Sequence, residues 1–146
     1  MTNPRNAANT DSYHRRTYPN TALNSINQGD NVYEDPSTFD VKSLDSDAHA
    51  VYYVGVSDET YPGLAEVPNL PKDISVLRWQ RVKMFLKNGD TATCGCDLYW
   101  GGDAQTVSVT GTNKIGTLAN VPDHTQDSVV GTGTNLVYVD LYHSKN

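Results

Sequence analysis

The sequence lacks long apolar runs and is poor in positive charge. No stretch of about eighteen consecutive apolar residues occurs, and no basic segment followed by an apolar one opens the chain, which argues against a membrane span and a secretory signal. The eleven Lys and Arg are outnumbered by seventeen Asp and Glu, so the formal net charge is -6. Nucleic acid is therefore not expected as the main partner, because phosphate contacts need clustered basic residues.

Cysteine and phenylalanine are also scarce, with two residues of each type. Eleven Gly and nine Tyr stand against them in a chain of 146 residues. This length suits one domain with one core, and this composition favours strands and turns over a helical bundle. The sequence therefore predicts an all-β domain.

Motifs for catalysis are missing. The chain has no G-x-S-x-G, no phosphate-binding glycine loop and no H-E-x-x-H. Asp58 with Glu59, or Asp97 with Asp103, could be imagined as acid and base, but no pattern places them in a pocket. We interpret these carboxylates as solvated loop charges and expect that the protein is not an enzyme.

The two cysteines are separated by one residue, as Cys94 and Cys96. Thiols at this spacing share one face of a strand and could bind a soft metal. A zinc site needs four ligands, and the histidines are scattered at positions 14, 49, 124 and 143. We therefore predict two small, partly buried thiols, with no metal site and no cofactor. A disulfide between them would violate ordinary disulfide geometry.

The chain divides at about residue 48. Its first 31 residues are polar, with Leu23 and Ile26 as the only long aliphatic side chains. We expect residues 1–48 to form an extended polar arm and an acidic linker, and residues 49–146 to form the β-domain. Eight acidic residues lie in the segment 30–59, and five basic ones lie in the segment 72–87. These segments could pair within one subunit or between neighbours.

Alternation of apolar and polar residues predicts the strands. We expect strands at 50–56, 114–121 and 135–142, and a hairpin over 96–109 whose turn is Gly101-Gly102-Asp103. Segment 74–86 also has helical spacing, but its β-branched and aromatic residues favour a strand that ends in an Asn88-Gly89 hairpin turn. About six to eight strands would make a small β-barrel or β-sandwich.

A basic and aromatic cluster stands out in the polar arm. The stretch SYHRRTYP contains Tyr13, His14, Arg15, Arg16 and Tyr18. Tyr and Arg are typical anchors of protein interfaces, because each combines a broad apolar face with a directional polar group. The cluster indicates an interaction segment, with a disordered solubilising tail as the alternative.

From residue 50 onward the order of motifs resembles that of the capsid decoration, or cement, proteins of tailed bacteriophages. The matching segments are Val54-Gly55-Val56, Cys96 to Trp100, Thr106 to Thr110, Gly111 to Gly116 and Val137 to Leu141. The resemblance spans about residues 50–142. The N-terminal arm lies outside it.

This resemblance implies a structural protein on the outer capsid surface of a virion, assembled in the host cytoplasm, that stabilises contacts between major capsid subunits. It also implies a homo-oligomer, with a trimer favoured, and no nucleic acid, membrane or cofactor as partner. The expected capsid-binding residues are Tyr13, His14, Arg15, Arg16, Tyr18, Arg78, Arg81 and Lys83. An extended arm of 24 residues could span about 80 Å.

Two other hypotheses stay open. A receptor-binding or glycan-binding head-fibre module would use exposed Tyr53, Tyr61 and Trp79. An enzyme would use Cys94 or Cys96 as its nucleophile.

Overall fold

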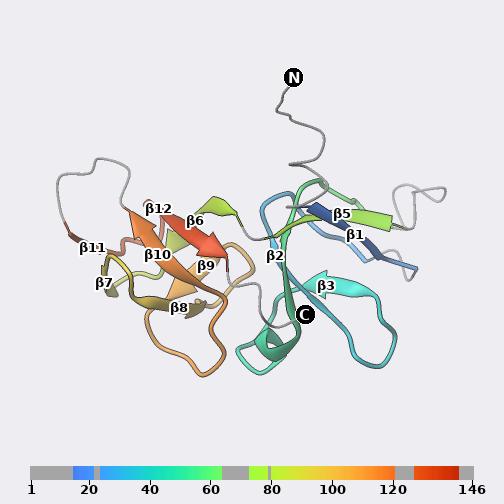
Figure 1. Ribbon diagram of the computed structural model, residues 1–146, viewed down its shortest axis with the longest axis horizontal. Helices are drawn as coiled ribbons and strands as arrows, with labels where there is room; N and C mark the ends of the chain where they lie inside the picture. The colour runs from blue at the N-terminus through green and yellow to red at the C-terminus, as the bar shows by residue number, and fades with distance from the viewer. Residues whose placement is uncertain (1–14, 22–23, 64–72, 79, 121–126, 142–146) are drawn as a thin grey trace, which may run out of the picture.

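A computed structural model describes residues 15–21, 24–63, 73–78, 80–120 and 127–141 of the chain. Its regular structure is almost entirely β, which confirms the predicted fold class. A five-stranded sheet and a five-stranded closed barrel lie side by side (Figure 1).

The sheet is built from the N-terminal half of the chain. Its strands are β1 (Arg15–Pro19), β2 (Asn31–Glu34), β3 (Val41–Ser43), β4 (Tyr53–Ser57) and β5 (Asp73–Leu77). They lie in the order β1-β5-β4-β2-β3, and all neighbours are antiparallel. A short 3-10 helix, η2 (His49–Tyr52), precedes β4. Among the described residues, β1 and β3 are the two edge strands.

The barrel is built from the C-terminal half. Its strands are β6 (Arg81–Leu86), β8 (Asp97–Trp100), β9 (Thr106–Ser108), β10 (Gly116–Asn120) and β12 (Leu136–Leu141). They close in the order β10-β12-β6-β9-β8, with β6 and β9 parallel and the other neighbours antiparallel. A separate ribbon pairs β7 (Thr91–Thr93) with β11 (Ser128–Val130).

Alternation along the strands fills the barrel. In β6, Met84 and Leu86 are buried and Val82 packs against the same core. In β12, Val137 and Val139 are fully buried. Side chains at the intervening positions therefore point out of the barrel, because successive residues of a strand face opposite sides.

The sheet buries both of its faces. One face joins the barrel core through four large side chains, Tyr33, Leu44, Tyr53 and Val56. The other face has its own cluster, consisting of Tyr18, Ile26, Val32, Val41, Val54, Tyr61, Ile74 and Val76. The sheet is thus the middle layer between two apolar cores.

The boundary predicted at residue 48 does not separate an arm from the domain. Residues 15–19 pair along β5, and the segment 31–43 supplies two further strands. Ile26 is completely buried, although the polar composition of this segment predicted an extended polar arm. Sparse apolar residues can contribute to a core when distant strands complete it. The expected arm residues 1–14 lie outside the described residues.

The single strand predicted over 74–86 is in fact two strands in different layers. β5 ends at Leu77 in the sheet, and β6 begins at Arg81 in the barrel. The Asn88-Gly89 turn is present, because Asp90 N–H donates to the Lys87 carbonyl at 3.2 Å and Gly89 has a φ of +90°. It is not a hairpin turn, however, since β7 pairs with β11.

The hairpin predicted over 96–109 is confirmed. β8 pairs with β9, with Tyr99 opposite Ser108 and Trp100 opposite Val107. Leu98 is fully buried in the barrel, and Trp100 packs partly against the same core.

Candidate functional site

The expected arm anchors have different environments. Arg15 is exposed and pairs with Asp58 at 2.8 Å, and Arg16 lies over the ring of Tyr18, 5.4 Å from its centroid. Tyr18 itself is only 4% exposed, and its burial raises the pKa of its hydroxyl. Tyr18 is therefore a core residue of the sheet, and the expectation that it anchors a partner is wrong. Tyr13 and His14 lie outside the described residues.

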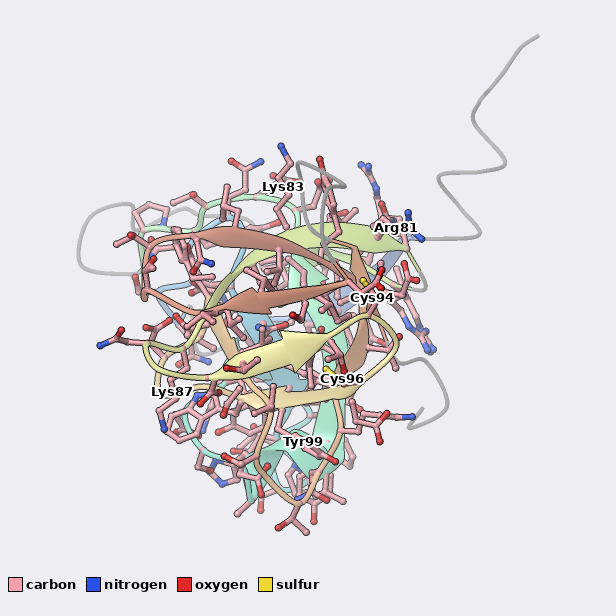
Figure 2. All side chains as sticks on the ribbon, turned by 90° about the vertical axis from the view of Figure 1, so that its left-hand side faces the viewer. Arg81, Lys83, Lys87, Cys94, Cys96 and Tyr99 are labelled. Carbon is pink, nitrogen blue, oxygen red and sulfur yellow. The ribbon has the colours of Figure 1, made fainter. Side chains whose placement is uncertain are left out.

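The expected basic residues after β5 divide between two places. Arg81 and Lys83 lie on the outer face of β6 and project from one edge of the molecule, whereas Lys87 lies well away from them (Figure 2). Arg78 is half-buried near Tyr18, where its charge opposes the rise in the tyrosine pKa.

The exposed pair on β6 has partners on the neighbouring strand. Arg81 Nε donates to Asp140 Oδ1 at 3.0 Å, and this contact raises the pKa of the guanidinium. The Lys83 ammonium lies 5.7 Å from the ring centroid of Tyr138. Arg81 thus pairs within the barrel rather than with the acidic segment 30–59.

The most exposed large apolar side chain in the described residues was not predicted. Phe39, at the tip of the β2–β3 hairpin, is 63% exposed and has a φ of +64°. Bulky residues rarely adopt this left-handed backbone conformation, and strained residues of this kind cluster at functional sites. An apolar residue inside the polar turn DPSTFD was the available sequence signal.

The hairpin fixes this strained conformation from both sides. Phe39 N–H donates to the Asp35 carbonyl at 2.7 Å, and Asp35 N–H donates to the Asp40 carbonyl at 2.8 Å. Lys42 Nζ bonds Asp35 Oδ2 at 2.8 Å, which lowers the pKa of the Asp35 carboxyl and raises that of the Lys42 amine. The ring of Phe39 is therefore presented on a tied loop.

The two cysteines lie in a turn rather than on one strand face. Cys96 N–H donates to the Thr93 carbonyl at 3.0 Å, and Gly95 between the thiols has a φ of +88°. Figure 2 shows the two sulfur atoms apart. Cys94 is exposed, whereas burial raises the pKa of the Cys96 thiol. An activated nucleophile needs the opposite shift, so this environment gives no support to Cys96 as a nucleophile.

The carboxylates considered as acid and base have structural partners. Asp58 pairs with Arg15, and Asp97 lies 3.5 Å from Lys114. Asp103 accepts hydrogen bonds from the Gln105 N–H at 2.8 Å and the Thr106 hydroxyl at 3.0 Å, which holds the β8–β9 turn. Asp97 and Asp103 are exposed, as the interpretation of them as solvated charges predicts, whereas Asp58 is half-buried in its ion pair with Arg15.

Searches over the described ranges found neither a metal cluster nor a membrane helix. No group of three or more His, Cys, Asp or Glu in that part of the chain could hold a metal ion. No helix there has the length and hydrophobicity needed to cross a bilayer.

Two of the three residues expected to bind a glycan are buried rather than exposed. Tyr53 and Tyr61 are 1% and 5% exposed, and both belong to the cores. Trp79 lies outside the described residues.

Comparison with known proteins adds no assignment. The sequence matches no protein-family model, and a search of curated proteins finds no relative. The chemistry of the exposed groups is therefore the basis for any proposal about function.

Proposed function

We propose that this protein is a structural virion protein that binds the outer surface of a tailed-phage capsid and stabilises contacts between major capsid subunits. It would act as a homo-oligomer, with a trimer favoured, because several weak contacts made together multiply the overall affinity. The motif order that resembles decoration proteins supports this role. Four of those five segments contribute to one closed barrel, β8, β9, the approach to β10, and β12.

The observation that carries the proposal is the presentation of Phe39. Phe39 is 63% exposed, so its apolar ring is in water, which is less favourable than burial. The left-handed backbone of this residue adds strain of about 1 kcal/mol or more. Buried aromatic anchors are typical hot spots of protein interfaces. A tied hairpin that holds such a ring in solvent suits attachment to another protein surface better than catalysis.

The exposed cations supply a second contact type. Arg15, Arg16, Arg81 and Lys83 stay among the proposed capsid-binding residues, and Phe39 takes the place of the buried Tyr18. Such charges steer association, and salt weakens their attraction to a partner. The gain from burying an aromatic ring does not depend on this screening.

The test is co-sedimentation of the purified protein with expanded capsid shells that lack it. We expect the wild-type protein to saturate the shells and Phe39→Ala to weaken binding by about thirtyfold, the effect of losing a hot-spot side chain of about 2 kcal/mol. The melting temperature should not fall, because the exposed ring makes little apolar contact and an alanine in the same left-handed conformation carries a similar backbone strain.

Val130→Ala is the matched control. Val130 is 58% exposed, but it lies on the β7–β11 ribbon. Its substitution should leave shell binding unchanged. Absence of wild-type protein from the shells would overturn the proposed function, and unchanged binding of Phe39→Ala would overturn the role of the ring alone.

A further inference from the structure

A cleft of about 540 Å³ opens where the sheet meets the barrel. Four separate segments line it, the turn before β2, the outer face of β6, the β8–β9 turn and the turn before β12. The side chains that matter for its chemistry are Asn27, Asp30, Phe85, Asp103, Gln105 and Thr134. A volume of this size falls within the range of small-molecule sites in proteins.

The wall of the cleft is a built hydrogen-bond network. Asp30, 5% exposed, accepts from the Asn27 N–H at 3.0 Å and from the Ser43 hydroxyl at 2.7 Å. Gln105 Nε2 donates to the other oxygen of Asp30 at 3.0 Å, which links the barrel to the sheet. These polar groups are fixed before any ligand arrives, so binding would cost little ordering entropy.

The charge of the cleft selects its ligand. Asp30 and Asp103 line it, and among the described residues that line it none is Lys, Arg or His. The two carboxylates would repel phosphates, sulfates and acidic sugars, because no described lining residue carries a compensating positive charge.

A metal ion fits poorly for a different reason. Calcium needs roughly six to eight oxygen ligands. Asp30 already accepts hydrogen bonds from three protein donors and Asp103 from two, so the two carboxylates together leave few free acceptor sites for a metal ion. The remaining lone pairs suit single hydroxyl donors.

An aromatic ring completes the site. Phe85 alternates with the buried Met84 and Leu86 on β6, so its half-buried ring lies outside the barrel and lines the cleft. Polar acceptors beside a half-buried aromatic ring match the two sides of a sugar ring, which has hydroxyl groups at its rim and apolar C–H groups on its faces.

We propose that this cleft binds a neutral saccharide of one or two units, with the sugar face on Phe85 and its hydroxyls bonded to Asp103, Gln105 and the exposed amide of Asn27. This site differs from the residues Tyr53, Tyr61 and Trp79 expected from the sequence. It does not depend on the capsid proposal, because the argument for the cleft uses only the residues that line it.

The test is an NMR titration of the isotope-labelled full chain with neutral saccharides at millimolar concentrations, namely glucose, galactose, mannose, N-acetylglucosamine and their common disaccharides. We expect one of them to shift the backbone amides of Gln105 and Thr134 in a saturable manner. Phe85→Ala should weaken that binding about tenfold, the value of one aromatic contact.

Tyr138→Ala is the matched control, because Tyr138 is a half-buried aromatic residue on the outer face of the neighbouring strand β12 and is not among the described residues that line the cleft. It should bind the sugar with wild-type affinity. Asn27→Ala tests the polar side, since the Asn27 side chain is exposed and its removal should weaken binding without loss of fold.

Three outcomes would overturn the proposal. The sugars could leave the cleft amides unshifted, Phe85→Ala and Tyr138→Ala could bind equally well, or inorganic phosphate or spermidine could shift the same amides in place of the sugars. None of these results bears on co-sedimentation with shells, so the two proposals fail independently.

Discussion

The sheet and the barrel have five strands each but bury them in different ways. Every barrel strand has a hydrogen-bonded neighbour on both sides, whereas in the described part of the chain β1 and β3 each have such a neighbour on one side only. The barrel core comes from contiguous alternating segments such as β6 and β12. The sheet core combines single residues from turns and strands far apart in the chain. The closed barrel is therefore the more regular half, whereas the sheet has two edge strands and carries the β2–β3 hairpin.

One buried polar residue joins the two halves. Asn31 N–H and Nδ2 donate to the Ala104 carbonyl at 2.7 and 3.0 Å, and Asn31 Oδ1 accepts from the Tyr53 hydroxyl at 2.8 Å. Burial raises the pKa of Tyr53 well above its ordinary value. The joint therefore depends on directional bonds in a dry environment, where a lost partner is costly.

The largest expected effect comes from removing the edge strand. Deletion of residues 1–24 eliminates β1 and takes Tyr18 away from Ile74, so we expect stability to fall by more than about 3 kcal/mol. Urea unfolding gives the free energy. Hydrogen exchange should show that β5 loses protection before β12 does, because the barrel keeps all its ladders.

Deletion of residues 1–14 is the control, since it leaves every described strand in place. Equal stability of the two truncated proteins would mean that β1 is not part of the folded sheet and that residues 1–24 are an arm after all.

A smaller effect is expected from breaking the joint. Asn31→Ala should cost about 3 kcal/mol, because it leaves the buried Tyr53 hydroxyl without its acceptor and creates a small cavity. Tyr53→Phe removes the same bond from the other side and should cost about 1 to 2 kcal/mol. The loss in the double variant should be less than the sum. Strict additivity in urea unfolding would show that the two groups do not interact.

The smallest expected effect is the difference in stability between alanine substitutions at two adjacent glycines of the barrel hairpin. Gly101 does not need a left-handed backbone, but an added Cβ would lie 2.7 Å from the Val107 carbonyl carbon. Gly102 has a φ of +113° and open space around it. We therefore expect Gly101→Ala to cost about 2 kcal/mol or more through steric overlap, and Gly102→Ala to cost about 1 kcal/mol through backbone strain. Thermal unfolding would contradict this if Gly102 were the more sensitive site.

The sequence by itself determined much of the barrel. Alternation over residues 114–121 and 135–142 predicted two of its strands, which the structure has as β10 and β12, and Gly101-Gly102-Asp103 predicted the hairpin turn. Both signals are local, because a strand repeats every two residues and a turn needs only its own few residues.

Only the tertiary structure decided the sheet and the candidate surface. Tyr18 looked like an exposed anchor until β5, more than fifty residues later, was placed beside it, and Tyr53 looked exposed until the barrel covered it. The left-handed backbone of Phe39 follows from a loop closed by Asp35 and Lys42. Burial and strain at these positions depend on partners distant in the chain or on the closure of a whole loop, which local periodicity does not encode.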